Sequence, residues 1–178
     1  MYTVPVGYIV VDLLFYVASA ILIADLIRKR MYMRKVKAMI QKKQYQAIIK
    51  YSQDKYKSFL FSENFKVGIA VSIIMTAFQV EDYDLAFSYI DKIKPKKASQ
   101  YKASFYMYAY LLTEDNAKAE EVFRGFSSKT DPVSIRAVNE YKPYFDFLAT
   151  GKPIDESFLQ EIKDPLQKKI YSKITPKV

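Results

Sequence analysis

The N-terminal run Val4–Ile27 is almost entirely apolar, and its charged residues are Asp12 and Asp25. It is longer than the roughly 20 residues that a helix needs to cross the hydrocarbon core of a bilayer. No lysine or arginine precedes the run, and a cluster that we call the basic collar follows it: Arg28, Lys29, Arg30, Arg34, Lys35 and Lys37. We therefore expect residues 1–30 to form a single transmembrane anchor, with the collar extending to residue 37.

The collar also predicts the orientation of this anchor. Positively charged flanks stay on the cytoplasmic side, so we expect the N-terminus outside the cell membrane and residues 31–178 in the cytoplasm. There the collar would contact anionic lipid headgroups. A cleaved secretory signal is disfavoured because no positive segment precedes the run, which also continues past the small residues Val17–Ala20. The other alternative is a buried core helix of a soluble protein. It is disfavoured because the run is apolar on all sides and a basic collar follows it.

Four residues of the apolar run share one helical face: Tyr8, Asp12, Tyr16 and Ser19. A carboxylate inside the membrane costs about 2.5–3.5 kcal/mol on insertion scales, so its presence calls for an explanation. One interpretation is that this polar face packs against another transmembrane helix, in a second copy of the chain or in a different membrane protein. The other is that Asp12 lies near enough to the outer surface to stay hydrated or protonated.

The rest of the chain has helical spacing of apolar residues and almost no strand signal, which predicts an all-α fold. Asp82 is an expected N-cap, Pro95 an expected stop, and Asp131-Pro132 an expected helix start. We expect the first helix to continue to about residue 43, and we expect a bend near Pro143. The other predicted helices cover residues 44–56, 65–79, 83–93, 99–112, 117–126, 132–149, 155–163 and 165–173.

Three segments along the chain resemble one another. They begin at positions 44, 82 and 115, so successive segments are 38 and 33 residues apart. A small residue with an aromatic three or four positions later recurs, as Ala86 with Tyr89 and as Ala119 with Phe123. A helix pair with this period is similar to tetratricopeptide repeats. The first segment departs from that pattern with Ile48 at the small position, and no segment has the usual Trp or Gly. The resemblance covers about residues 31–126, and an irregular helical bundle is the alternative.

The resemblance implies a surface for protein binding. Such repeat proteins bind peptides or helices on the first helix of each pair. In the third pair, Tyr101, Phe105 and Tyr108 have the spacing of a core stripe, whereas Tyr106 and Tyr110 lie on a second face. We expect Tyr106 and Tyr110 to form an aromatic contact surface, since Tyr is frequent at interfaces. Alternatively, a closed bundle buries both rings and leaves only their hydroxyl groups in water.

The composition argues against chemistry. The chain has no cysteine or histidine, which excludes disulfides, thiol nucleophiles and the usual zinc or haem ligands. It has only 4 glycines, which argues against a Gly-rich phosphate loop. We expect neither an enzyme nor a cofactor or metal. The collar supplies 6 of the 28 basic residues, and no recognition motif suggests nucleic acid.

Together these features predict a membrane-tethered adaptor or scaffold, of bacterial type by its composition, that binds a protein partner through its cytoplasmic helices. The alternative is an accessory subunit of a membrane complex for secretion, envelope biogenesis or division, held mainly by its transmembrane helix.

Overall fold

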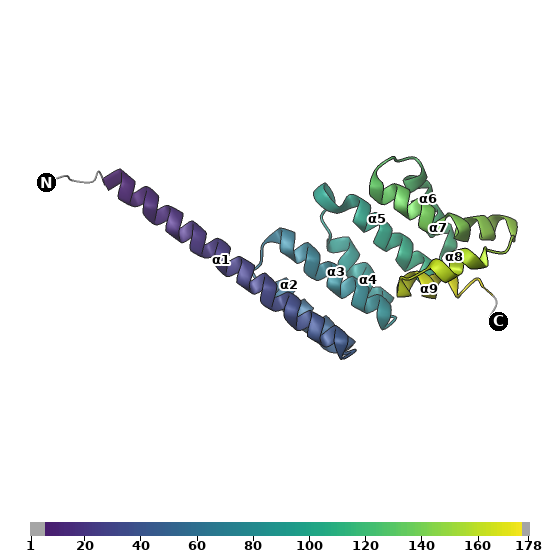
Figure 1. The fold of residues 1–178 in the computed structure, drawn as a ribbon, viewed down its shortest axis with the longest axis horizontal. Coiled ribbons are helices and arrows are strands. Elements are labelled where there is room, and N and C mark those ends of the chain that lie inside the picture. Colours follow the sequence, from purple (N-terminus) through teal and green to yellow (C-terminus); the bar gives the residue numbers. More distant parts are fainter. Residues whose placement is uncertain (1–5, 176–178) are drawn as a thin grey trace. The chain divides into compact units, whose positions relative to one another are not determined.

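The computed structural model describes the backbone of residues 6–175 and the side chains of residues 15–94 and 101–175. All regular secondary-structure elements within that range are helices, which confirms the all-α prediction (Figure 1). The helices are α1 (Val6–Gln41), α2 (Tyr45–Lys57), α3 (Glu63–Gln79), α4 (Tyr83–Lys92), α5 (Pro95–Leu112), α6 (Asn116–Ser127), α7 (Pro132–Thr150), α8 (Glu156–Glu161) and α9 (Pro165–Tyr171).

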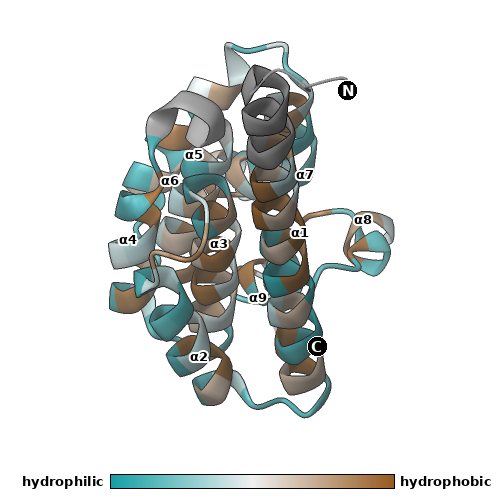
Figure 2. Ribbon diagram, turned by 90° about the vertical axis from the view of Figure 1, so that its left-hand side faces the viewer, coloured by the Kyte–Doolittle hydropathy of each residue, from teal (hydrophilic) through white to brown (hydrophobic). Residues whose placement is uncertain are grey.

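The chain divides into two compact units, residues 1–69 and residues 70–178. The boundary falls within α3, which is more apolar on average than α1 and is largely brown in Figure 2. Most predicted helices match, with one clear difference at α5. This helix begins at Pro95, four residues before the predicted start at Ser99. Proline ends one helix but is equally suited to the first position of the next, where its missing N–H has no partner to lose.

Three turns between helices have the same backbone geometry. In each, one residue that is not glycine takes a left-handed conformation, and the N–H of the following residue bonds to the carbonyl five positions earlier. These bonds satisfy the free carbonyls at the end of the preceding helix. The turns lie at the same spacing as the repeated sequence segments. The left-handed residues are Lys43 (φ 54°), Glu81 (φ 62°) and Glu114 (φ 63°).

The turn at Lys43 provides a direct test of this geometry. A left-handed conformation is unfavourable for a residue with a Cβ and natural for glycine, so Lys43→Gly should stabilise the protein by about 0.5–1 kcal/mol. The matched control is Lys42→Gly, where glycine only adds freedom to the unfolded chain and should destabilise by a similar amount. Chemical unfolding of the full chain measures both. A loss of stability in both variants would contradict the assigned turn.

In the first unit, Tyr32 joins α1 to the helices that follow. Its side chain is only 1% exposed, and its hydroxyl group lies 2.9 Å from the hydroxyl of Ser52 on α2. Its ring stacks on Tyr51, with centroids 5.7 Å apart, and meets the edge of Phe65 on α3 at 5.5 Å. As predicted, α1 continues without interruption past the collar to Gln41. The collar and this aromatic contact therefore lie on one continuous helix.

The N-terminal half of α1 leaves large apolar side chains uncovered. Those exposed between residues 15 and 27 are Phe15, Tyr16, Val17, Ile21, Leu22, Ile23, Leu26 and Ile27. In the part of the chain that the structure describes, no helix contains a stretch long and apolar enough to cross a membrane. The predicted span Val4–Ile27 begins outside that part.

In the second unit, small residues allow the helices to approach closely. Ala86 on α4 and Ala119 on α6, which occupy the predicted small positions, are completely buried. An aspartate is the N-cap of both helices. The Asp82 carboxylate accepts from the Leu85 N–H at 3.1 Å, and the Asp115 carboxylate accepts from the Lys118 N–H at 3.3 Å. The two helices therefore start and pack alike.

The last helix, α9, and the turn that follows it fasten two of the three turns between helices. Lys169 pairs with Glu81 at 2.6 Å, and Lys173 pairs with Glu114 at 2.7 Å. Lys173 also donates to the carbonyl of Leu112 at the end of α5, at 2.9 Å. A positive charge at the C-terminus of a helix interacts favourably with the helix dipole. Each of these lysines lowers the pKa of the glutamate that it contacts. The C-terminal segment thus closes the second unit.

A proline inside α7 provides the docking point for α9. Pro143 has no N–H, and proline loosens the hydrogen-bond ladder around it. Next to it, the carbonyl of Glu140 accepts from the Tyr171 hydroxyl at 2.8 Å and from the Gln167 side chain at 3.2 Å. The Tyr171 hydroxyl in turn accepts from the N–H of Tyr144. Side chains of α9 thus form hydrogen bonds with backbone groups of α7 next to the proline.

Removing this hydroxyl should weaken the protein. Tyr171→Phe keeps the ring but leaves buried backbone groups short of a partner, so it should destabilise by about 1–3 kcal/mol. Tyr101→Phe is the control, since the Tyr101 side chain is 56% exposed and should tolerate the change. Denaturant unfolding of both variants decides the matter. Equal midpoints for the two variants would show that the hydroxyl does not stabilise the junction of α7 and α9.

Candidate protein-binding surfaces

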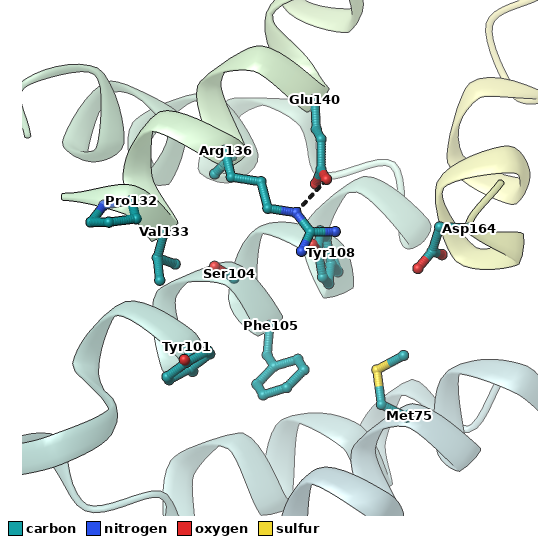
Figure 3. Close-up of a pocket in the computed structure, with 11 residues that line it drawn as sticks. Met75, Tyr101, Ser104, Phe105, Tyr108, Pro132, Val133, Arg136, Glu140 and Asp164 are labelled. Carbon is teal, nitrogen blue, oxygen red and sulfur yellow. Dashed lines mark hydrogen bonds and ion pairs between the residues drawn. The ribbon is translucent and has the colours of Figure 1, made fainter. Parts of the chain in front are cut away.

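A groove of about 410 Å³ lies in the second unit along α5 and α7 (Figure 3). Both helices contribute side chains at positions three, four or seven residues apart, which places them on one face of each helix. Met75 from α3 and Asp164 from the start of α9 complete its walls. The side chains from α5 are Tyr101, Ser104, Phe105 and Tyr108, and those from α7 are Pro132, Val133, Arg136, Ala137 and Glu140.

The groove combines aromatic surface with one ion pair. The Arg136 side chain is 75% exposed, and its Nε donates to Glu140 Oε1 at 2.6 Å. Tyr108 hydrogen-bonds through its hydroxyl to Tyr141 behind it. Burial and the nearby charge of Glu140 raise the pKa of Tyr108, so this hydroxyl stays neutral at physiological pH. The groove therefore offers a guanidinium, a carboxylate and neutral phenol groups to a ligand.

Asp164 both lines the groove and caps a helix. Its carboxylate accepts from the N–H groups of Leu166 at 2.7 Å and Gln167 at 3.1 Å, so it is the N-cap of α9. No group of three or more acidic side chains in the described residues is arranged to hold a metal ion. The side chains of the groove suit recognition of another molecule through ring contacts and hydrogen bonds.

Tyr106 and Tyr110, the predicted contact surface, lie on the other face of α5. Their rings stack with centroids 5.9 Å apart, and Phe87 on α4 lies 5.4 Å from the Tyr110 ring. Both side chains are half-buried and line a hollow of about 280 Å³ with Lys118, Glu121 and Val122 of α6. Each ring therefore has partners within the chain as well as an open side.

The hydroxyl of Tyr106 is also engaged, because it donates to the carboxylate of Asp91 on α4. Burial, the hydrogen bond to Asp91 and the charge of that carboxylate together raise the pKa of Tyr106 to about 12. On the neighbouring ring, Lys118 lies with its Nζ 5.5 Å from the Tyr110 centroid. Lys118 is itself paired with Asp115 at 2.7 Å. Contacts within the chain thus account for much of this face.

The raised pKa of Tyr106 predicts an alkaline dependence of stability. A tyrosine of the unfolded chain ionises near pH 10, so the stability from neutral Tyr106 is complete below that pH. It is lost as the pH rises toward about 12, where the folded protein also releases the proton. Tyr106→Phe should be less stable than wild type at neutral pH, and the two unfolding free energies should converge as the pH rises. Parallel curves would contradict the assigned hydrogen bond.

The core stripe expected on α5 is only partly buried. Phe105 is buried, but Tyr101 is exposed and Tyr108 is half-buried, so the prediction that this stripe is ordinary core was wrong for Tyr101. Sequence reasoning also missed Arg136 and Glu140. Their separation of four residues, shortly after the helix start at Pro132, was the available signal. The groove therefore combines an α5 stripe that periodicity had assigned to the core with α7 residues that the sequence analysis had not singled out.

The collar residues all lie on α1. Arg28 and Lys29 are half-buried, and the other four are exposed. Lys29 pairs with Asp25 at 2.5 Å and lies 5.5 Å from the centre of the Phe65 ring. Lys35 lies 4.4 Å from the centre of the Tyr51 ring. Two collar charges thus contact aromatic rings of the same unit.

The predicted polar face of the anchor is described only in part. Tyr16 is exposed and Ser19 is half-buried. The side chains of Tyr8 and Asp12 lie outside the described residues.

Comparison of the chain with protein-family models, with curated proteins and with solved structures gave no match.

Proposed function

We propose that the chain is a membrane-tethered adaptor or scaffold that holds a protein partner at the inner face of the cell membrane. In this proposal Val4–Ile27 is a single-pass anchor with its N-terminus outside, and residues 31–178 form a cytoplasmic helical domain. The exposed apolar side chains between residues 15 and 27 support the anchor, since a surface of this size is costly in water. The basic collar that follows supports the orientation.

The repeated turns support a tetratricopeptide-like arrangement of the cytoplasmic helices. The left-handed residues at positions 43, 81 and 114 recur at the period of the sequence repeat, and the N-cap residues after them have similar backbone angles. An aspartate side chain caps the second and third of these helices but not the first. In such an arrangement α3, α5 and α7 are the first helices of successive pairs. These are the helices that line the groove.

The observation that carries the proposal is this groove. Its exposed Tyr101 and Arg136 belong to the residue types that contribute most to protein interfaces. Cys and His are missing from the chain, and we infer a role in binding rather than in catalysis.

Site-specific crosslinking in native membranes tests the proposal. A photoreactive amino acid at position 101 should form an adduct with a protein partner. Arg136→Ala should reduce the yield of that adduct by about tenfold, which corresponds to ~1.4 kcal/mol of binding energy. The matched control is Arg124→Ala on α6, because Arg124 is equally exposed and is also paired with a glutamate one turn away, Glu120.

The outcome of this experiment separates the two functions that we expect from the sequence. Loss of the adduct with Arg136→Ala but not with Arg124→Ala supports the groove. If instead position 101 forms no adduct while a photoreactive residue at Tyr16 or Ser19 does, the chain is an accessory subunit held through its transmembrane helix. The exposed side chain of Tyr16 is the observation that favours this second candidate.

A further inference from the structure

The loop between α2 and α3 exposes two adjacent apolar side chains. Phe59 is 89% exposed and Leu60 is 45% exposed, whereas the next residue, Phe61, is buried. The Phe61 ring lies 5.2 Å from Phe65 and 6.5 Å from Tyr32, so the base of the loop is fixed in the core of the first unit. The tip therefore presents its apolar residues outward from a rigid base.

Side-chain contacts place this loop at a definite level along α1. The short turn at residues 42–44 makes α2 run back along α1, and the bond between Ser52 and Tyr32 sets their register. From Ser52, α2 continues five residues to Lys57, which is about 8 Å of helix. The same distance from Tyr32 toward the N-terminus of α1 reaches Ile27.

The loop thus begins beside the end of the apolar run and the start of the collar. The contact between Lys29 and the Phe65 ring, 5.5 Å from its centre, agrees with this level, since Phe65 also contacts the base of the loop.

Basic residues flank the exposed tip along the chain. Lys55 and Lys57 lie in the last turn of α2, and Lys66, which pairs with Glu63 at 3.0 Å, lies in the first turns of α3. On α1 the collar begins near the same level with Arg28 and with Lys29, which pairs with Asp25. An aromatic and a leucine side chain flanked by lysines match the surface of an anionic bilayer: apolar groups enter the acyl boundary while ammonium groups remain among the headgroups.

We propose that this loop, residues 58–62, is a second membrane contact, with Phe59 and Leu60 inserted into the cytoplasmic leaflet of an anionic bilayer beside the anchor. The proposal rests on the proposed function, because it requires α1 to be anchored. Its consequence is that the first unit has two points of attachment. Two contacts fix its rotation about the anchor, which one helix alone would leave free.

The absence of tryptophan from the chain allows a direct measurement. Three variants of the full chain each receive a single tryptophan: Phe59→Trp in the loop, Phe15→Trp in the anchor and Tyr101→Trp in the second unit. Each is reconstituted into vesicles containing phosphatidylglycerol and brominated lipids that quench tryptophan at known depths. All three positions are exposed, so the substitutions should leave the fold intact.

The proposal predicts a different result at each position. Phe59→Trp should show emission at shorter wavelength and lose most of its fluorescence to bromines near the headgroups. Phe15→Trp should be quenched by bromines deep in the acyl chains, and Tyr101→Trp should not be quenched. In vesicles of phosphatidylcholine alone, quenching at position 59 should fall while quenching at position 15 persists.

Two failures can be distinguished. If the chain does not float with vesicles and Phe15→Trp is not quenched, the proposed anchor is wrong, and the loop proposal fails with it. If Phe15→Trp is quenched but Phe59→Trp keeps the emission of an aqueous tryptophan, the anchor stands and the loop does not touch lipid. A blue shift at position 59 without quenching by any brominated lipid would assign the loop to a protein contact and also overturn the proposal.

Discussion

The helical pairs of this protein depend on a turn in which one residue takes the left-handed conformation. The turn bonds the last carbonyls of one helix and aligns the N-cap of the next within a few residues. At Glu81 and Glu114 the residue that reverses the chain also pairs with a lysine, Lys169 of α9 and Lys173 of the turn after it. The counterpart in the first unit, Lys43, carries the opposite charge and would repel such a lysine. In the second unit, Glu81 and Glu114 therefore both reverse the chain between helices and hold the C-terminal segment in place.

Much of the fold could be predicted from the sequence, because apolar spacing and caps are local signals. Asp82 and the Asp131-Pro132 pair marked helix starts that the structure confirms. Pro95 was interpreted as a stop, and a stop and a start look alike when one helix follows another closely. The left-handed turns had no signal, since glycine, which usually marks them, is missing from all three. The docking of α9 at Pro143 required knowledge of contacts far apart in the chain.

The candidate site was less predictable for a related reason. Periodicity shows that Tyr101, Phe105 and Tyr108 share a face of α5, but it cannot show which part of that face a neighbour covers. The neighbouring helix α7 leaves the N-terminal part of the stripe open. On the other face, Tyr106 and Tyr110 already contact Asp91, Phe87 and Lys118. A partner would have to compete with these contacts there, whereas in the groove it adds to exposed surface.

The first unit connects the charge pattern of the sequence to its packing. Tyr32 lies between the collar residues Arg30 and Arg34, and it is the residue that α2 and α3 cover. If the collar rests at the membrane surface, charge sets the depth of α1 and the burial of Tyr32 sets which side of α1 the other helices occupy. A shift of α2 along α1 would separate Tyr32 from its two partners on α2, Ser52 and Tyr51. The level of the loop at Phe59 therefore follows from the core contact and does not depend on the loop's own conformation.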